Sequence, residues 1–179
     1  MSVTAVETTA QYLTFRLGEE VFALDITQVR EVLDFPQITR VPRMPAFMRG
    51  VTNLRGAVVT VVDLHLKFGM TATERTVNSC VIIFEVDLAG ERTVLGALAD
   101  SVQEVIDLAP GQIEPAPRIG ASLRTEFIRG IGKHDDQFVI ILDVDRVFSG
   151  GELAVVHGAG ETATAHAKAG LGTVAAANA

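Results

Sequence analysis

Two pairs of acidic or histidine side chains have spacings that could support metal binding or acid–base catalysis. Asp63 and His65 lie two residues apart, and Asp143 and Asp145 repeat that spacing with two carboxylates. A metal site needs about four ligands, and two scattered ones do not form it. Paired carboxylates catalyse proton transfer only where opposed environments separate their acidities. Nothing in the sequence indicates either condition, so it predicts no catalytic residue, no metal ligand and no cofactor.

A glycine-rich segment, Gly130-Ile131-Gly132-Lys133, is similar to part of a phosphate-binding loop. The spacing of that motif is absent, however, and His134 stands where the motif has the Ser or Thr that binds magnesium. We expect instead a glycine-eased bend or hairpin between two strands. The adjacent Asp135-Asp136 pair is typical of a polar turn.

Asp63 and Asp143 have a structural explanation. Each follows a run of Val and Ile, and each precedes one apolar turn, residues 64–68 and 144–148 respectively. An aspartate in that place can accept hydrogen bonds from the first backbone amides of a short helix. We therefore interpret both residues as helix N-caps.

The composition is that of a folded, acidic protein without internal disulfides. Of 179 residues, 48% are hydrophobic and 21% charged, and the net charge is −7. An acidic chain has no electrostatic attraction for nucleic acid or for anionic lipid. The single cysteine, Cys80, lies in an apolar run and is expected to be buried in a strand. Residues 1–9 lack the features of a signal peptide, and apolar runs of about five residues are far too short to span a bilayer. We expect a cytoplasmic protein.

Short runs rich in Val, Ile and Phe, separated by Gly, Pro and Asp, predict an all-β fold with short helices. The segment 26–33 also fits a helical spacing, so a short turn is expected before its strand. The predicted strands are Tyr12–Leu17, Val21–Asp25, Val29–Phe35, Val51–Leu54, Val58–Val62, Val77–Val86, Thr93–Leu98, Val102–Leu108, Ile128–Gly132 and Phe138–Leu142.

An internal repeat is the most informative pattern. Phe47-Met48-Arg49-Gly50-Val51 matches Phe127-Ile128-Arg129-Gly130-Ile131 at an offset of 80 residues, without a gap as far as residues 68 and 148. Upstream, Val29-Arg30-Glu31-Val32 matches Val102-Gln103-Glu104-Val105 at an offset of 73. One β unit is therefore used twice. About five strands per unit favour a small closed or half-closed barrel, because closure removes exposed edges, and two such barrels can pack together.

The chain divides into three parts. Residues 1–10 are expected to form a flexible N-terminus, and residues 11–149 the folded domain with its two repeated barrels, the N-terminal strand possibly contributed across them. Residues 150–179 are mostly Ala, Gly and Thr without a strand period, and they predict a flexible tail.

Positions that differ between the two copies are the better candidates for function. Arg55 precedes Gly56 in a predicted turn, where an exposed guanidinium could anchor an interface or simply be solvated. Glu31 alternates with Val32 and faces the opposite side of its strand, as a solvated residue or as the polar part of a contact face.

Several of these segments closely resemble the chemotaxis coupling proteins of the CheW family. They cover most of residues 11–149, and the Asn-Leu-Arg-Gly and Val-Asp-Leu motifs in register are the most specific signal. The segments are Val29–Val32, Ile38–Pro42, Pro45–Gly56, Val61–Leu64 and Phe127–Ile131.

The resemblance implies two SH3-like five-stranded β-barrels that share a hydrophobic interface. It implies a non-enzymatic adaptor that joins the cytoplasmic tip of methyl-accepting chemotaxis receptors to the regulatory domain of the histidine kinase CheA. Such a protein is cytoplasmic and associated with membrane chemoreceptor arrays, without membrane insertion, nucleic acid, metal or cofactor. The positions that match family contact residues are Val29, Glu31, Gly50 and Arg55, with Arg55 on the receptor side.

Two alternatives stay open. One is a CheW-like scaffold of a related non-motility chemosensory pathway. The other is a small barrel that binds a ligand or an oligonucleotide. The acidic charge, the absence of Trp and the single Tyr disfavour the second alternative.

Overall fold

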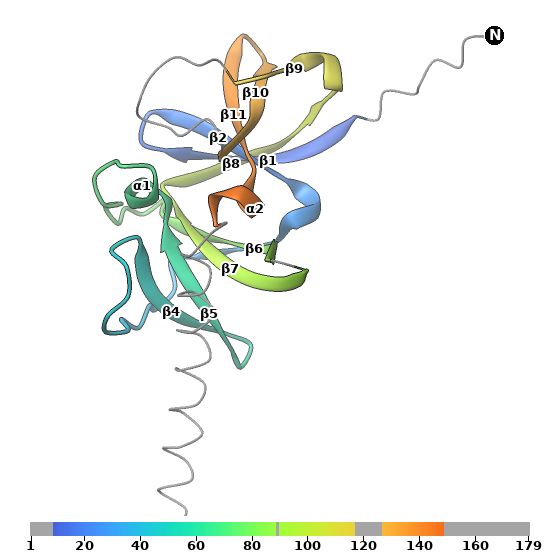
Figure 1. Cartoon of the computed structure of the whole chain (residues 1–179). Coiled ribbons are helices and arrows are strands. Elements are labelled where there is room, and N and C mark those ends of the chain that lie inside the picture. Colours follow the sequence, from blue (N-terminus) through green and yellow to red (C-terminus); the bar gives the residue numbers. More distant parts are fainter. Residues whose placement is uncertain (1–8, 89, 117–126, 149–179) are drawn as a thin grey trace, which may run out of the picture.

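The computed structural model describes residues 9–88, 90–116 and 127–148, and within them almost every regular element is a strand (Figure 1). The strands are β1 (Ala10–Leu17), β2 (Glu20–Asp25), β3 (Val29–Asp34), β4 (Met48–Leu54), β5 (Ala57–Asp63), β6 (Cys80–Leu88), β7 (Glu91–Ala99), β8 (Ser101–Leu108), β9 (Ile113–Glu114), β10 (Ile128–His134) and β11 (Gln137–Leu142). The helical elements are single turns: η1 (Ile26–Gln28), α1 (Leu64–Lys67), η2 (Pro110–Gln112) and α2 (Val144–Val147).

The strands form two sheets, which Figure 1 shows one above the other. Sheet A has the order β8-β1-β2-β11-β10-β9, and sheet B has the order β3-β6-β7-β5-β4. Neighbouring strands are antiparallel except for β2 with β11 and β5 with β7, which are parallel. The first two strands therefore belong to the same sheet as the strands of the second half of the chain.

The two sheets repeat one arrangement, as the sequence repeat predicts. The unit β4-β5-α1 recurs as β10-β11-α2, 80 residues later. Even the irregularity recurs, because the register between the hairpin strands shifts at Met48/Gly50 in one copy and at Ile128/Gly130 in the other. The order β3-β6-β7-β5-β4 thus corresponds to β8-β1-β2-β11-β10.

Each sheet curls so that strands at or next to its two edges approach each other. In sheet B, a side chain at the end of β4 reaches β3: Arg55 donates from Nη2 to Glu31 Oε2 at 3.0 Å. In sheet A, His134 Nε2 at the end of β10 lies 3.9 Å from Glu104 Oε1 on β8. By bringing these strands close together, a small β protein limits its exposed strand edges. The all-β fold of two tandem barrel-like units is thereby confirmed.

Three apolar cores hold the two sheets. The largest lies between them and includes Phe15 and Phe22 of sheet A, Phe84 of sheet B and Phe148, which follows α2. A smaller core belongs to each sheet alone: one contains Tyr12 and others of sheet A, and the second contains residues of β5, β6 and β7. Because strand side chains alternate between faces, β6 can place Ile82 and Phe84 in the shared core, with Val81 and Ile83 in the core of sheet B.

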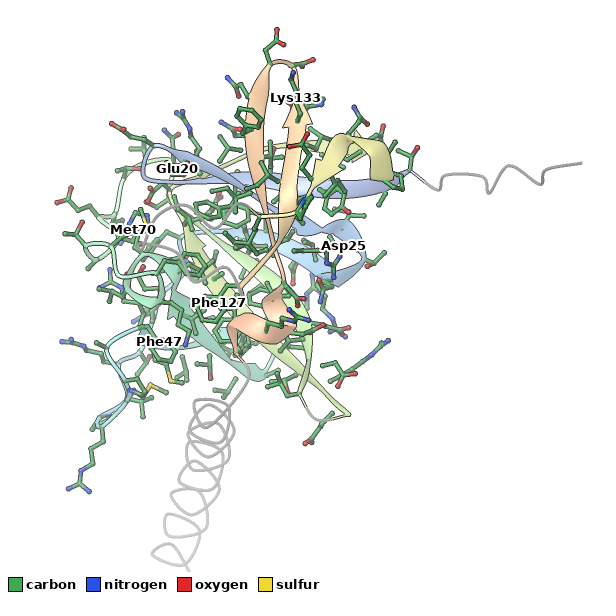
Figure 2. All side chains as sticks on the ribbon, turned by 45° about the horizontal axis from the view of Figure 1, so that its top comes forward. Glu20, Asp25, Phe47, Met70, Phe127 and Lys133 are labelled. Atoms are coloured by element: carbon green, nitrogen blue, oxygen red, sulfur yellow. The ribbon has the colours of Figure 1, made fainter. Side chains whose placement is uncertain are left out.

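A row of neighbouring aromatic rings crosses the shared core. Ring centroids are 6.1 Å apart for Phe15–Phe22, 5.8 Å for Phe22–Phe68 and 6.1 Å for Phe68–Phe127. Lys67 Nζ then lies 5.6 Å from the centre of the Phe127 ring and 4.7 Å from the centre of the Phe47 ring. Phe47 and Phe127, the matched residues of the repeat, are both labelled in Figure 2 near the middle of the molecule. The cation–π contacts join the two copies at equivalent positions.

Three local expectations need correction. Strand β6 begins at Cys80 rather than Val77, because Thr76 and Ser79 close a turn in which the Thr76 amide donates to Ser79 Oγ at 2.8 Å. The segment 130–133 lies within β10, and the hairpin turn falls at residues 135–136, the predicted polar turn. Sheet A has a sixth strand, the two-residue β9, which was too short to show a period in the sequence.

Other local expectations are confirmed. The short turn before β3 is η1. Cys80 is buried in β6, and burial raises the pKa of its thiol, with smaller effects from nearby groups. The thiol therefore behaves as a small apolar side chain. Of the N-terminal part predicted at residues 1–10, residues 1–8 lie outside the described residues, and β1 already begins at Ala10. The tail predicted at residues 150–179 also lies outside the described residues.

Asp63 and Asp143 both cap helices, but their surroundings differ. Asp63 is fully buried and accepts from the His65 amide at 3.0 Å, from the Thr73 amide at 3.0 Å and from Thr73 Oγ1 at 2.7 Å. Asp143 is partly exposed and accepts from the Arg146 amide at 3.3 Å. Asp63 therefore also fixes the loop after α1 against the sheet.

We predict that Asp63→Ala lowers the free energy of unfolding by about 3 kcal/mol, because it leaves several buried donors without an acceptor. The matched substitution Asp143→Ala removes a cap and a surface ion pair with Arg146, and it should lower the free energy of unfolding by about 1 kcal/mol. Urea denaturation of both variants beside the wild type measures the difference. Equal losses would contradict the role assigned to Asp63.

Candidate partner-binding surface

Arg55 lies at the tip of the β4–β5 hairpin, as predicted. It and Gly56 form a two-residue turn in which both residues have positive φ, 51° and 87°. That geometry belongs to the type I′ turn, whose twist matches the strands. Asn53 supports the turn, because its Oδ1 accepts from the Gly56 amide at 2.8 Å. The Arg55 side chain is 80% exposed.

Glu31 lies on β3 and reaches the same place from the other edge of sheet B. Its carboxylate accepts from Arg55 at 3.0 Å, although 24 residues separate the two in the sequence. Along β3, Val29, Glu31 and Leu33 share a half-buried face, and Val32 lies on the exposed side. The predicted alternation is confirmed, but it places the carboxylate on the more buried face and the valine in solvent.

The Arg55–Glu31 pair orients the guanidinium but leaves most of its N–H donors unbonded to Glu31. An ion pair with one exposed partner contributes little to stability, about 0.5 kcal/mol. Only one donor atom of Arg55 is engaged with Glu31, whereas a guanidinium carries five N–H donors in a planar fork. The pair therefore holds an exposed, largely unoccupied cationic group at a fixed place on the surface.

Val29 and Gly50 do not join this pair. Val29 is half-buried and packs against the shared core. Gly50 is buried in β4 with φ of 143°, and a Cβ there would lie 2.1 Å from the backbone oxygen of Thr39. Thr39 and Val51 exchange two backbone hydrogen bonds of 2.8 Å at this point. The structure thus gives both residues a role in folding, and their contact with a partner stays a prediction.

Exposed apolar side chains were missed in the sequence, although the repeat could have found them. Val32 is 41% and Val105 48% exposed, and these two are matched at the offset of 73. Val58 is 50% and Phe138 67% exposed, and these two are matched at the offset of 80. Because they are exposed at equivalent places of both copies, these four residues are candidates for contact with a partner.

The two surfaces carry different charge. Where sheet B has Arg55, sheet A has Asp135, and the neighbouring His134 lies 3.3 Å from the Asp135 carboxylate. The hairpin tip of sheet B therefore carries a cation, Arg55, and the equivalent tip of sheet A carries two carboxylates, Asp135 and Asp136. The difference allows the two surfaces to bind unlike partners.

Within the described part of the chain, no group of three His, Cys, Asp or Glu residues is placed to hold a metal ion. No helix among the described residues is long and apolar enough to cross a membrane. The exposed residues at equivalent positions of the two copies are therefore the candidate site.

Comparison with known proteins agrees with that description. The scaffolding protein TtCheW from Thermoanaerobacter tengcongensis has a similar structure, with a TM-score of 0.72 and 34% identity over 81% of this chain and 91% of that one. The Chemotaxis protein CheW of Klebsiella aerogenes is 37% identical over 157 residues, which are 87% of this chain and 92% of the relative. The Probable chemotaxis protein CheW of Rhizobium etli is 33% identical over 139 residues, 78% of this chain and 87% of the relative.

The fold and these relatives together define a small β-rich protein of the scaffold class. The family of the CheW-like domain matches residues 11–152. This chain belongs to the CheW family, the scaffold adaptors of chemotaxis.

We predict that Gly50→Ala destabilises the fold by more than about 2 kcal/mol, because the new Cβ cannot share space with the Thr39 backbone. Gly56→Ala is the matched control: it also has positive φ, but nothing lies within 4 Å of its Cβ position. Gly56→Ala should lower the free energy of unfolding by only about 1 kcal/mol. Thermal melts and urea titrations compare the two. A Gly50→Ala protein as stable as the Gly56→Ala protein would show that the close approach is unimportant.

Proposed function

We propose that this protein couples chemoreceptors to the histidine kinase CheA. It would bind the cytoplasmic tip of methyl-accepting receptors with one surface and the regulatory domain of the kinase with others, at membrane-associated arrays. The observation that carries this proposal is the Arg55–Glu31 pair, which holds an exposed guanidinium where the two edge strands of sheet B, β3 and β4, approach each other. Membership of the CheW family supports it.

Arg55 and its neighbourhood suit a helical receptor tip that carries carboxylates. A guanidinium fork binds carboxylate through two parallel hydrogen bonds, which fixes direction as well as charge. Val32 is exposed on the opposite side of the edge strand β3 from Glu31, so a partner that covers this edge can bury it while it contacts Arg55. Apolar contact supplies affinity, and the cation fixes the register of the partner.

The exposed apolar side chains on the two hairpins suit contact with other β-barrels. Val58 and Phe138 occupy equivalent places in the two copies and are both at least half exposed. The CheA regulatory domain, which the family resemblance gives the same fold, would present similar surfaces. Two such contacts allow one adaptor to lie between two kinase domains.

Each contact can be weak on its own. When several are linked in an array, the second binding event occurs at a high effective concentration and strengthens the whole. A signal then passes as a change in how the kinase domains are held, with no chemical step in the adaptor. Rigid attachment of the two surfaces to one core favours this way of working.

We predict that Arg55→Glu weakens binding to a receptor tip fragment at least about tenfold, or 1.4 kcal/mol, because carboxylates then face carboxylates. Binding to the isolated kinase regulatory domain should change less than about twofold. Arg92→Glu is the matched control, since Arg92 is equally exposed but lies on β7, 3.8 Å from Glu85. Calorimetry with each partner fragment measures the affinities, and co-elution tests the ternary complex.

The double variant Arg55→Glu/Glu31→Arg separates recognition from structure. It restores the ion pair with reversed charge, so a merely structural role predicts recovery of receptor binding. The proposal predicts that binding stays weak. Wild-type protein that is folded but binds neither fragment would refute the coupling function itself.

A further inference from the structure

The loop between β3 and β4, residues 35–47, has an unusual charge for this protein. From Phe35 to Val62 the sequence contains four arginines and no Asp or Glu, although the net charge of the whole chain is −7. The four are Arg40, Arg43, Arg49 and Arg55. Such a segregated positive region needs an explanation beyond solubility.

Two of the four arginines have hydrogen-bond or ion-pair partners within the fold, and two have no carboxylate partner among the described residues. Arg49 donates to the Thr73 carbonyl at 3.1 Å and lies 3.9 Å from the Asp63 carboxylate, and Arg55 pairs with Glu31. Arg40 and Arg43 are exposed and have no carboxylate partner among the described residues. They lie on either side of Val41-Pro42 in the same loop.

These two arginines border a hollow of about 340 Å³. Its apolar lining includes Val41, Met44, Pro45 and Met48. Met44 also packs against the shared core, which fixes the floor of the hollow. Methionine side chains adapt to the shape of an apolar group that enters. Figure 2 shows this loop standing out from the body beside the labelled Phe47.

The loop is held in place before any partner arrives. Thr39 exchanges two backbone hydrogen bonds with Val51, Thr52 Oγ1 donates to the Gln37 carbonyl at 2.9 Å, and the Met48 amide donates to the Pro45 carbonyl at 3.0 Å. Arg43 adopts a positive φ of 64° outside a hairpin turn, a conformation that few arginines take. A held loop loses little entropy when it binds.

We propose that this hollow binds an acidic protein segment whose carboxylates flank one aliphatic side chain. The guanidinium groups of Arg40 and Arg43 would bind the carboxylates, and the methionine-lined hollow would bind the aliphatic group. The loop leads into the first residue of β4 and Arg55 follows its last, so the hollow and Arg55 lie roughly 20 Å apart along the strand. The surface is therefore separate from the Arg55–Glu31 pair and does not depend on the receptor proposal.

A protein segment fits better than nucleic acid. Single-stranded nucleic acid binds by stacking bases on open aromatic rings. The rings beside this loop are already covered, Phe35 by Arg75 at 4.5 Å and Phe47 by Lys67 at 4.7 Å. Two cations beside an apolar hollow suit carboxylates around an apolar anchor.

Fluorescence anisotropy with a labelled peptide tests the proposal on the full chain. The probe has one leucine between glutamate pairs, and the comparison probes replace the leucine by serine or every glutamate by glutamine. Wild-type protein should bind the first probe at least about tenfold more tightly than either comparison probe. Arg40→Glu/Arg43→Glu should lose at least about tenfold in affinity for the first probe while its thermal melt stays unchanged.

Arg16→Glu/Lys133→Glu is the matched control, with the same change of charge at two exposed cations of sheet A. It should bind the first probe nearly as the wild type does. Equal loss in both double variants would mean that only net charge matters, and the proposal would be wrong. It would also be wrong if the serine probe bound as well as the leucine probe, if an oligothymidylate bound more tightly, or if no probe bound.

Discussion

Apolar side chains from both sheets meet in one central core, and neither sheet can bury that face without the other. Four phenylalanines are fully buried there, Phe15, Phe22, Phe84 and Phe148. Burial of one such side chain contributes about 2–3 kcal/mol, so the shared core is a large part of the stability of either sheet. The small cores inside each sheet are too limited to replace it.

The shared core also explains why a doubled fold is useful for a scaffold. It joins the two barrel-like units rigidly, and each unit carries exposed residues at equivalent positions. Substitution at those exposed positions can then give the unit of sheet B a guanidinium, Arg55, and the unit of sheet A carboxylates such as Asp135, without a change in the packing beneath. A scaffold that must bind unlike partners at fixed relative positions needs this combination.

Much of the fold could be predicted because its signals are local or repeated. The alternation of Val and Ile located the strands, and the two offsets exposed the repeat. The caps at Asp63 and Asp143 follow from an aspartate between a strand and one apolar turn. The family resemblance then identified the barrels and their shared interface.

What the sequence did not show depends on long-range contacts. Nothing local indicates that β1 and β2 pair with β8 and β11, because tertiary packing sets strand order. The Arg55–Glu31 pair appears only when sheet B curls, and the close approach of the Thr39 backbone to Gly50 is likewise visible only in the structure. Alternation places Glu31 and Val32 on opposite faces of the strand, but only the structure shows that the valine is the more exposed of the two.

Native-state amide hydrogen exchange tests the central claim most directly, that the shared core makes the two sheets one rigid unit. If it does, the slowest amides of β2 in sheet A and of β6 in sheet B open only together, with free energies that agree within about 1 kcal/mol and equal that of global unfolding. If the amides of one sheet exchange through a separate opening several kcal/mol easier, the sheets are independent units, and the account of a scaffold with two fixed surfaces is contradicted.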